Sequence, residues 1–252
     1  MDRKSGTPSV QSTITSMRVI DAMRDGGVGV TELANELDIH KSTAYKHLST
    51  LEDLDCVKKI DEQYHLGPKL IQLGETTKHQ HGIYTRAQSV IDQLAETTEE
   101  YVGFSLEHHH RCYNIYTARG RLALQNFTGT PHATELYSTA AGKAILSQFT
   151  QDQLDQYITA TDFTAETERT ITDPDELQDA IVRVQERNIA FSREEHKVGI
   201  RSVAVPYQNE SLNLYGAIYV QAPADRITGK RFNEDIPGMV NSAIEKMAKD
   251  GY

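Results

Sequence analysis

Hydrophobic positions near the N-terminus recur at helical spacing and predict three helices in succession. The first spans residues 14–24 and ends at the glycine-rich sequence GGVG. A short helix over 32–37, with Thr31 as its N-cap, comes next, and a longer helix over 41–54 follows after a break. The side chains expected inside are Ile14, Met17, Val19, Ile20 and Met23 on the first helix, Leu33, Ala34 and Leu37 on the second, and Ala44, Leu48, Leu51 and Leu54 on the third.

Two short β-prone runs, CVKKI and QYHL, follow the third helix and are joined by Asp61 and Glu62. They predict a hairpin of the size that forms a wing. Helix, short helix, turn, helix and hairpin in this order are the pattern of a winged helix-turn-helix, whose last helix can enter the major groove of DNA. The pattern therefore predicts a DNA-binding head over 14–67, preceded by a disordered lead-in over 1–13.

The rest of the chain predicts a mixed domain. Pro68 stands at the first position of a linker helix over 68–82, where its missing N–H costs nothing. The next helix, over 83–100, has a buried face formed by Ile83, Ala87, Val90, Ile91, Leu94 and Ala95. Then come strand-like runs at 102–107, 112–117 and 121–127, helices near 139–147, 151–159 and 173–188, antiparallel strands at 200–207 and 212–220, and a C-terminal helix. We therefore expect an α+β protein with an antiparallel sheet in a second domain over 83–252.

Composition narrows the classes of function. The chain has 252 residues, 38% of them hydrophobic. It contains no run of about 18 apolar residues to cross a bilayer and no apolar N-terminal leader, so we expect a soluble, cytoplasmic protein with no membrane partner. Its two cysteines, Cys56 and Cys112, lie far apart and in no metal-binding spacing, which argues against a disulfide framework or a zinc ribbon.

The formal net charge of −10 is spread unevenly, in a way that bears on DNA binding. Residues 1–80 carry 10 Lys/Arg and 12 Asp/Glu, whereas residues 81–252 carry 16 and 24. Residues 40–49 contain two Lys, two His, three Ser/Thr and one Tyr but no acid, which suits a helix that meets phosphates and base edges. A solvated helix face is the alternative for these cations alone, but the neighbouring short helix, turn and wing favour DNA. The acidic, tryptophan-free composition fits either a high-salt cytoplasm or an ordinary acidic protein.

Short motifs that suggest an enzyme each lack a required residue. The sequence AAGKA differs from a phosphate loop because Tyr137 stands where glycine, and Ala144 where Ser or Thr, would be needed. It predicts a helix start, which either packs simply or cradles an anionic effector. The sequence from Glu194 to His196 lacks the second histidine of a zinc motif and favours a loop brace.

The histidine run from His108 to His110 falls in a predicted hairpin loop. Alternate side chains diverge there, so a solvated loop is favoured, although metal binding stays open. The sequence as a whole predicts no catalytic residue, no cofactor and no resident metal, and hence a protein that is not an enzyme.

Four blocks of sequence resemble the IclR family of transcription regulators. They are TELANELDIHKSTAYKHLSTLEDLDCV, YHLGPKLIQLG, LYSTAAGKAIL and REEHKVGIRSVAVP, and they occur in family order and at family spacing. The resemblance implies a winged helix-turn-helix head, a linker helix and a GAF-like α/β effector-binding domain. It also implies a homo-oligomer, dimer or tetramer, that binds pseudo-palindromic double-stranded DNA operators and responds allosterically to a small-molecule metabolite.

The resemblance and the outward-facing pattern together assign candidate site residues. The expected DNA contacts are Thr31, Lys41, Ser42, Thr43, Tyr45, Lys46 and His47, with Lys58 and Lys59 on the wing. The expected effector pocket draws on Leu136, Ser138, Thr139, Ala140, Ser192, Ile200, Ser202, Tyr219 and Gln221. Arg201 can pair with an effector carboxylate if it points inward. In the turn before the third helix, where the family usually has glycine, the chain has Asp38, which tolerates a left-handed backbone better than most residues.

These observations predict a ligand-responsive transcription regulator of metabolic, and specifically catabolic, genes. An enzyme with a fused DNA-binding head is one alternative, but it needs a nucleophile–base pair or a metal cluster that the sequence does not display. A protein-interaction role for the winged head is the other. A DNA affinity that falls as salt rises would distinguish the regulator from both.

Overall fold

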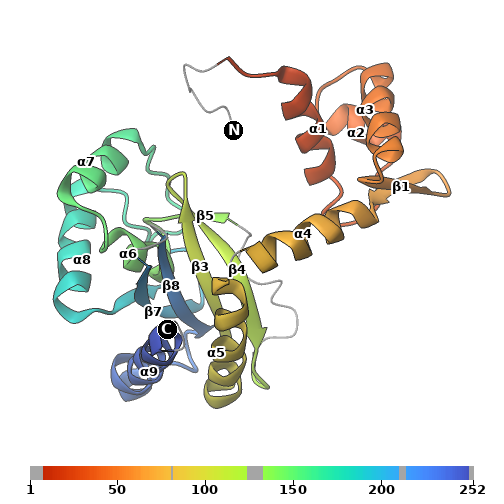
Figure 1. Ribbon diagram of the computed structural model, residues 1–252. Helices are drawn as coiled ribbons and strands as arrows, with labels where there is room; N and C mark the ends of the chain where they lie inside the picture. The colour runs from red at the N-terminus through yellow and green to blue at the C-terminus, as the bar shows by residue number, and fades with distance from the viewer. Residues whose placement is uncertain (1–7, 81, 124–132, 210–213, 250–252) are drawn as a thin grey trace. The chain divides into compact units, whose positions relative to one another are not determined.

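The computed structural model, shown in Figure 1, describes residues 8–80, 82–123, 133–209 and 214–249. The chain divides into two compact units, Met1–His81 and Gly82–Tyr252. Residues 1–7 of the predicted lead-in lie outside the described residues. The predicted boundary after residue 13 is wrong, because the first helix already begins at Gln11.

The first unit has the element order of a winged helix-turn-helix followed by one more helix. Its elements are α1 (Gln11–Asp21), α2 (Val30–Glu36), α3 (Lys41–Asp53), β1 (Val57–Ile60), β2 (Gln63–Leu66) and α4 (Pro68–Gln80). The first three helices share one core, in which Val19, Leu33 and Leu48 are completely buried. β1 and β2 form the antiparallel wing, and Val28 adds an isolated bridge to Tyr64.

Asp38 closes the turn between α2 and α3 in the left-handed conformation, with a φ of 53°. Its N–H donates to the carbonyl of Asn35 (3.3 Å) and the N–H of Ile39 donates to the carbonyl of Ala34 (3.0 Å), which is the pattern of a Schellman C-cap. Asp55 ends α3 with a similar φ of 59°. Aspartate therefore occupies, in both turns, the position where helices most often place glycine.

The burial of α1 and α3 differs from the prediction at three positions. Ile14 and Met17 are 41% and 53% exposed, because the buried face of α1 runs through Thr15 and Val19 instead. Leu54 is 58% exposed, because it is the C-cap of α3 rather than part of its apolar face.

The start of α2 also differs from the prediction. Thr31 is not the N-cap, because the helix begins one residue before it, at Val30. Gly29 is the N-cap residue, and its N–H donates to Oε2 of Glu32 at 3.4 Å. Thr31 is therefore an exposed residue of the first helical turn.

The second unit is a six-stranded antiparallel sheet with helices on both faces (Figure 1). Its elements are α5 (Ile83–Thr98), β3 (Tyr101–His108), β4 (Arg111–Arg119), β5 (Ala133–Glu135), α6 (Ala140–Leu146), α7 (Gln151–Ala160), α8 (Pro174–Arg187), β6 (Ala190–Arg193), β7 (Ile200–Asn209), β8 (Leu214–Pro223), the π-helical turn η2 (Arg231–Asp235) and α9 (Ile236–Lys249). The strand order is β5-β4-β3-β8-β7-β6.

Successive side chains of each strand point to opposite faces, so the sheet carries two hydrophobic cores. Val102 and Phe104 of β3 pack with α5 and α9. Ala217 and Tyr219 of β8 point to the other face and join the core formed with α6, α7 and α8. The second of these two faces carries the pocket described below.

The predicted α+β class is confirmed, with a helix-turn-helix head followed along the chain by a domain that has an antiparallel sheet. All six residues expected on the buried face of the helix after residue 83 are buried. The strand expected over 121–127 is wrong at 121–123, which form a turn, and otherwise lies outside the described residues. β6 was not predicted. Within the described ranges, no helix combines the length and the apolar character that crossing a membrane requires.

Candidate functional site

The outward face of α3 gathers five of the predicted DNA contacts. Ala44 and Leu48 are completely buried and fix the opposite face of this helix in the core. Tyr45 is 56% exposed, although a tyrosine that serves only packing would be covered. The outward side chains, exposed or half-buried, are Lys41, Ser42, Thr43, Tyr45 and Lys46.

The other predicted DNA contacts have different surroundings. Nδ1 of His47 lies 2.9 Å from Oγ of Ser16, so this half-buried imidazole joins α3 to α1. On the wing, Nζ of Lys59 lies 3.4 Å from Oε2 of Glu62, and this carboxylate raises the pKa of Lys59. Lys58 and Thr31 are exposed. The structure thus leaves the α3 face and Lys58 open to solvent and gives His47 and Lys59 protein partners.

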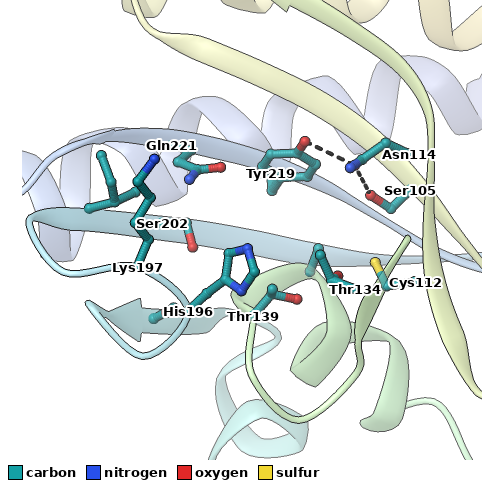
Figure 2. Close-up of a pocket in the computed structure, with 13 residues that line it drawn as sticks. Ser105, Cys112, Asn114, Thr134, Thr139, His196, Lys197, Ser202, Tyr219 and Gln221 are labelled. Atoms are coloured by element: carbon teal, nitrogen blue, oxygen red, sulfur yellow. Dashed lines mark hydrogen bonds between the residues drawn. The ribbon is translucent and has the colours of Figure 1, made fainter. Parts of the chain in front are cut away.

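A pocket lies in the second unit, between the sheet and the beginning of α6 (Figure 2). All six strands contribute at least one lining side chain, and the loop between β6 and β7 forms a further wall. The pocket therefore depends on the complete sheet.

Six of the nine residues predicted for an effector site line this pocket, namely Thr139, Ser192, Ile200, Ser202, Tyr219 and Gln221. Leu136, Ser138 and Ala140 are completely buried and do not line it. Thr139 faces the pocket and also caps α6, since its Oγ1 accepts the N–H of Gly142 at 2.9 Å. The predicted loop reaches the pocket through Thr139, and its three other predicted residues are not part of the lining.

Sequence reasoning missed seven lining residues, namely Ser105, Cys112, Asn114, Thr134, Ala141, His196 and Lys197. Most of them lie on β3, β4 and β5, far in sequence from the predicted loop, and only the pairing of the strands brings them there. One feature of the sequence could have pointed to these lining residues. Ser105 interrupts an otherwise apolar strand, YVGFSL, at a position that faces inward.

A buried hydrogen-bonded group forms one end of the pocket. Oδ1 of Asn114 accepts the hydroxyl of Ser105 at 2.8 Å and that of Tyr219 at 2.9 Å (Figure 2). Gly103 makes room for the ring, because a Cβ at this position would lie 2.4 Å from Cζ of Tyr219. A register shift after Phe104 accompanies the pairing of Ser105 with Asn114. The group is thus built into the sheet itself.

Two basic side chains line the pocket, and Nδ1 of one of them, His196, contacts Oε2 of Glu166 outside the lining. His196 and Lys197 line it, whereas no Asp or Glu does among the residues that the structure describes. Burial raises the pKa of the Cys112 thiol to about 11, so this side chain stays neutral near pH 7. Hydroxyl and amide groups make up most of the remainder. The lining is suited to a small polar or anionic molecule.

Arg201, considered as a carboxylate partner, points to the opposite face of the sheet. Its guanidinium carbon lies 5.5 Å from the ring centroid of Phe232, and Nη1 donates to the carbonyl of Ile227 at 3.1 Å. Strand neighbours alternate, so Ser202 takes the pocket side.

The histidine run and the AAGKA sequence have places in the fold that need no ligand. His109 and His110 form the turn between β3 and β4, with φ values of 52° and 61°. Across the described ranges, no group of three or more His, Cys, Asp or Glu side chains is arranged to hold a metal ion. Lys143 of the AAGKA sequence is buried within α6 and forms an ion pair with Glu195.

Comparisons with known proteins find matches to both parts of the chain. The family model described as bacterial transcriptional regulator IclR C-terminal matches residues 75–248, and a helix-turn-helix domain model matches residues 15–59. The probable HTH-type transcriptional regulator ArcR of Halobacterium salinarum is 27% identical and is aligned over 93% of this chain and 91% of its own. The HTH-type transcriptional regulator KdgR of Escherichia coli is 26% identical over 97% and 94%. The crystal structure of Thermotoga maritima IclR superposes with a TM-score of 0.78, at 25% identity, over 96% of this chain and 99% of that one.

A helix-turn-helix head and a separate C-terminal effector-binding domain define a ligand-responsive transcription regulator. The chain belongs to the IclR family. Its named relatives are transcriptional regulators, which confirms both the family resemblance and the prediction that the protein is not an enzyme.

Proposed function

We propose that the exposed face of α3 reads an operator in the major groove and that the pocket of the second unit binds the metabolite that changes operator affinity. The DNA assignment rests on the outward face of the first half of α3. This face carries no acidic residue, and its Lys41 and Lys46 are open to solvent. A helix of this type enters a groove about 12 Å wide, where lysines neutralise phosphates and the hydroxyls contact base edges.

The DNA assignment is tested by salt titration with the promoter fragment next to the gene. Lys41→Ala/Lys46→Ala removes two cations from each head, so the slope of log affinity against log salt should decrease in magnitude by about 1.8 for each head that binds, and affinity should fall about tenfold or more at moderate salt. Lys230→Ala is the matched control, because this lysine is 74% exposed in the second unit. Binding by the double variant with an unchanged slope would contradict the assignment of α3.

The pocket assignment rests on a hydroxyl-rich lining that includes His196 and Lys197 and, among the described residues, no Asp or Glu. A small carboxylate is the metabolite class that this lining favours, as a product of carbon or nitrogen catabolism would be. A solved structure of similar fold, only 13% identical, is described as an IclR homologue complexed with 4-hydroxybenzoate. The regulated genes are then metabolic, and the protein acts in the cytoplasm, where the DNA is.

Calorimetry with 4-hydroxybenzoate, other small carboxylates and uncharged sugars of equal size tests the pocket. Ser202→Met fills space next to Ser192 on the paired strand and should abolish binding, whereas Ser202→Ala should retain it. A coupling of about 1–3 kcal/mol between the pocket and the head would change operator affinity about 5- to 150-fold. If Ser202→Met still bound the carboxylate, the effector site would lie outside this pocket.

Exposed apolar side chains of the first unit support self-association on a pseudo-palindromic operator. Val10, Ile14 and Met17 recur along α1 with 65%, 41% and 53% exposure, and Ile71 on α4 is 70% exposed. Single exposed apolar residues are ordinary, but a row at helical spacing favours a partner. We expect a homo-oligomer, dimer or tetramer, and Met17→Glu/Ile71→Glu should lower its mass in sedimentation measurements. Retention of the wild-type mass would place the interface elsewhere.

A further inference from the structure

The pocket has one wall that does not belong to a strand, the 194–199 loop between β6 and β7. It supplies His196 and Lys197 to the lining (Figure 2). Glu194 and Gly199, at its two ends, have φ values of 70° and 78°. A non-glycine residue in this left-handed region persists only where its surroundings hold it there.

Contacts from the segment between α7 and α8 fasten the outer side of the loop. Oγ1 of Thr167 donates to the carbonyl of Glu194 at 2.8 Å, and Oγ1 of Thr170 donates to the carbonyl of Glu195 at 2.6 Å. The Glu194 carboxylate accepts the N–H of Gly199 at 2.9 Å and pairs with Nη1 of Arg169 at 2.5 Å. Three of these contacts fasten the loop to the segment between α7 and α8, and the contact between Glu194 and Gly199 closes the loop on itself.

The connection to α6 is a buried ion pair. Nζ of Lys143 contacts Oε2 of Glu195, and the two residues are only 4% and 8% exposed. The other carboxylate oxygen accepts the N–H of Arg193 at 3.2 Å. Burial lowers the pKa of Lys143, and the Glu195 carboxylate opposes that shift. Lys143 lies one turn beyond Thr139, which lines the pocket on the same helix.

Stability alone does not account for this pair. Moving two charges into the interior costs about as much as their attraction returns, and apolar side chains of similar volume often replace such a pair without loss. What the charges supply is direction, because Glu195 must stay beside Lys143 and His196 follows it in the chain. We propose that Lys143 and Glu195 are positioning residues that hold the 194–199 loop against α6 and thereby set the wall of the effector pocket.

Cys112 provides a readout that needs no known effector. It lines the pocket, is 2% exposed, and becomes the only thiol of the chain after Cys56→Ser. In this background we would measure the rate of its alkylation by iodoacetamide at mildly alkaline pH. Lys143→Met/Glu195→Met should be alkylated at least about tenfold faster than the parent, which corresponds to about 1.4 kcal/mol easier local opening. Its unfolding free energy should remain close to that of the parent.

The matched control is a second ion pair of the same unit, between a buried carboxylate and a half-buried arginine. Glu100 is completely buried, and Nη2 of Arg226 lies 2.7 Å from its Oε2, but neither residue lines the pocket. Glu100→Met/Arg226→Met should leave the alkylation rate of Cys112 unchanged. Equal rates in the parent and in the Lys143/Glu195 double variant would overturn the proposal.

If the double variant does not fold, Glu195→Gln with hydrogen exchange decides the question. Amides of the 194–199 loop should exchange at least about tenfold faster than in the parent, while those of α8 keep their rates. Unchanged loop amides would overturn the proposal.

The proposal rests on the pocket being the effector site, and a second arm separates the two ideas. Small carboxylates, including 4-hydroxybenzoate, should protect Cys112 of the parent from alkylation. Faster alkylation in the double variant without protection by any carboxylate would contradict the proposed effector class and still support the positioning role.

Discussion

Helix α3 presents its polar side chains to solvent from one continuous segment of 13 residues, whereas the pocket takes its polar side chains from the inward faces of six strands. On α3, the side chains that hold the fold and those that can meet DNA lie on opposite sides of the helix. In the pocket, Tyr219 and Cys112 belong both to the lining and to the hydrophobic core. Function and stability should therefore be separable in the head and coupled in the pocket.

The largest expected effect compares two glycines in helices. A Cβ on Gly142 of α6 would lie 2.1 Å from the backbone carbonyl of Leu136, so Gly142→Ala should lower the unfolding free energy of the second unit by at least about 3 kcal/mol. Gly74 of α4 has nothing within 4 Å, so Gly74→Ala should stabilise the first unit by about 0.5–1 kcal/mol. Chemical denaturation of both variants measures the difference, and equal effects would contradict the comparison.

The next effect concerns alkaline pH. Burial raises the pKa of Cys112 from 9.0 to about 11, so between these values the folded protein keeps a proton that the unfolded chain releases. The unfolding free energy should therefore fall as pH rises through this range, by about 1.4 kcal/mol per unit and about 3 kcal/mol in all.

Denaturation of Cys112→Ala across the same range isolates this contribution. The variant should lose less stability between pH 9 and pH 11 than the parent does. Some loss persists, because burial also raises the pKa of Tyr116 to about 12. Cys56→Ala, in the head, should keep the full loss. An identical pH profile for Cys112→Ala and the parent would show that the thiol is not protected by the pocket.

Two tyrosines give a smaller and more direct comparison. Tyr219→Phe removes a hydrogen bond of 2.9 Å to Asn114 inside the pocket and should cost about 1 kcal/mol of unfolding free energy. Tyr45→Phe removes an exposed hydroxyl on α3 and should change the unfolding free energy by less than about 0.5 kcal/mol while weakening operator binding. Denaturation and DNA-binding curves on both variants test the separation. A large loss of unfolding free energy in Tyr45→Phe would contradict the expectation that function and stability are separable in the head.

The smallest effect concerns the turn before α3. Asp38 has a φ of 53°, which glycine adopts without a steric penalty, so Asp38→Gly should stabilise the head by about 0.5 kcal/mol. Asp38→Ala should destabilise it by about 1 kcal/mol, because alanine lacks both the glycine freedom and the local hydrogen bonding of aspartate. Thermal denaturation of the head distinguishes the two signs, and a stabilising alanine would contradict the assigned turn.

Sequence reasoning was most successful where contacts are local. The order of the head, the buried Leu48 and Val19, the turn at Asp38 and the helix after residue 83 all follow from spacing within one segment. Its errors on the head came from competition between neighbouring positions of one helix. Ile14 is as apolar as Val19, and only the packing of α1 against its partners decides which of them is covered.

The amino-acid sequence by itself determined the winged head, the class of the second domain and the outward polar face of α3, because helical and strand periodicities are properties of consecutive residues. Tertiary structure decided the pocket. Ser105, Asn114 and Tyr219 meet only through strand pairing, and a strand sends neighbouring side chains to opposite faces, which is why Ser202 enters the pocket and Arg201 does not. The partnership of Lys143 with Glu195, 52 residues further along the chain, likewise exists only once α6 lies beside the loop that follows β6.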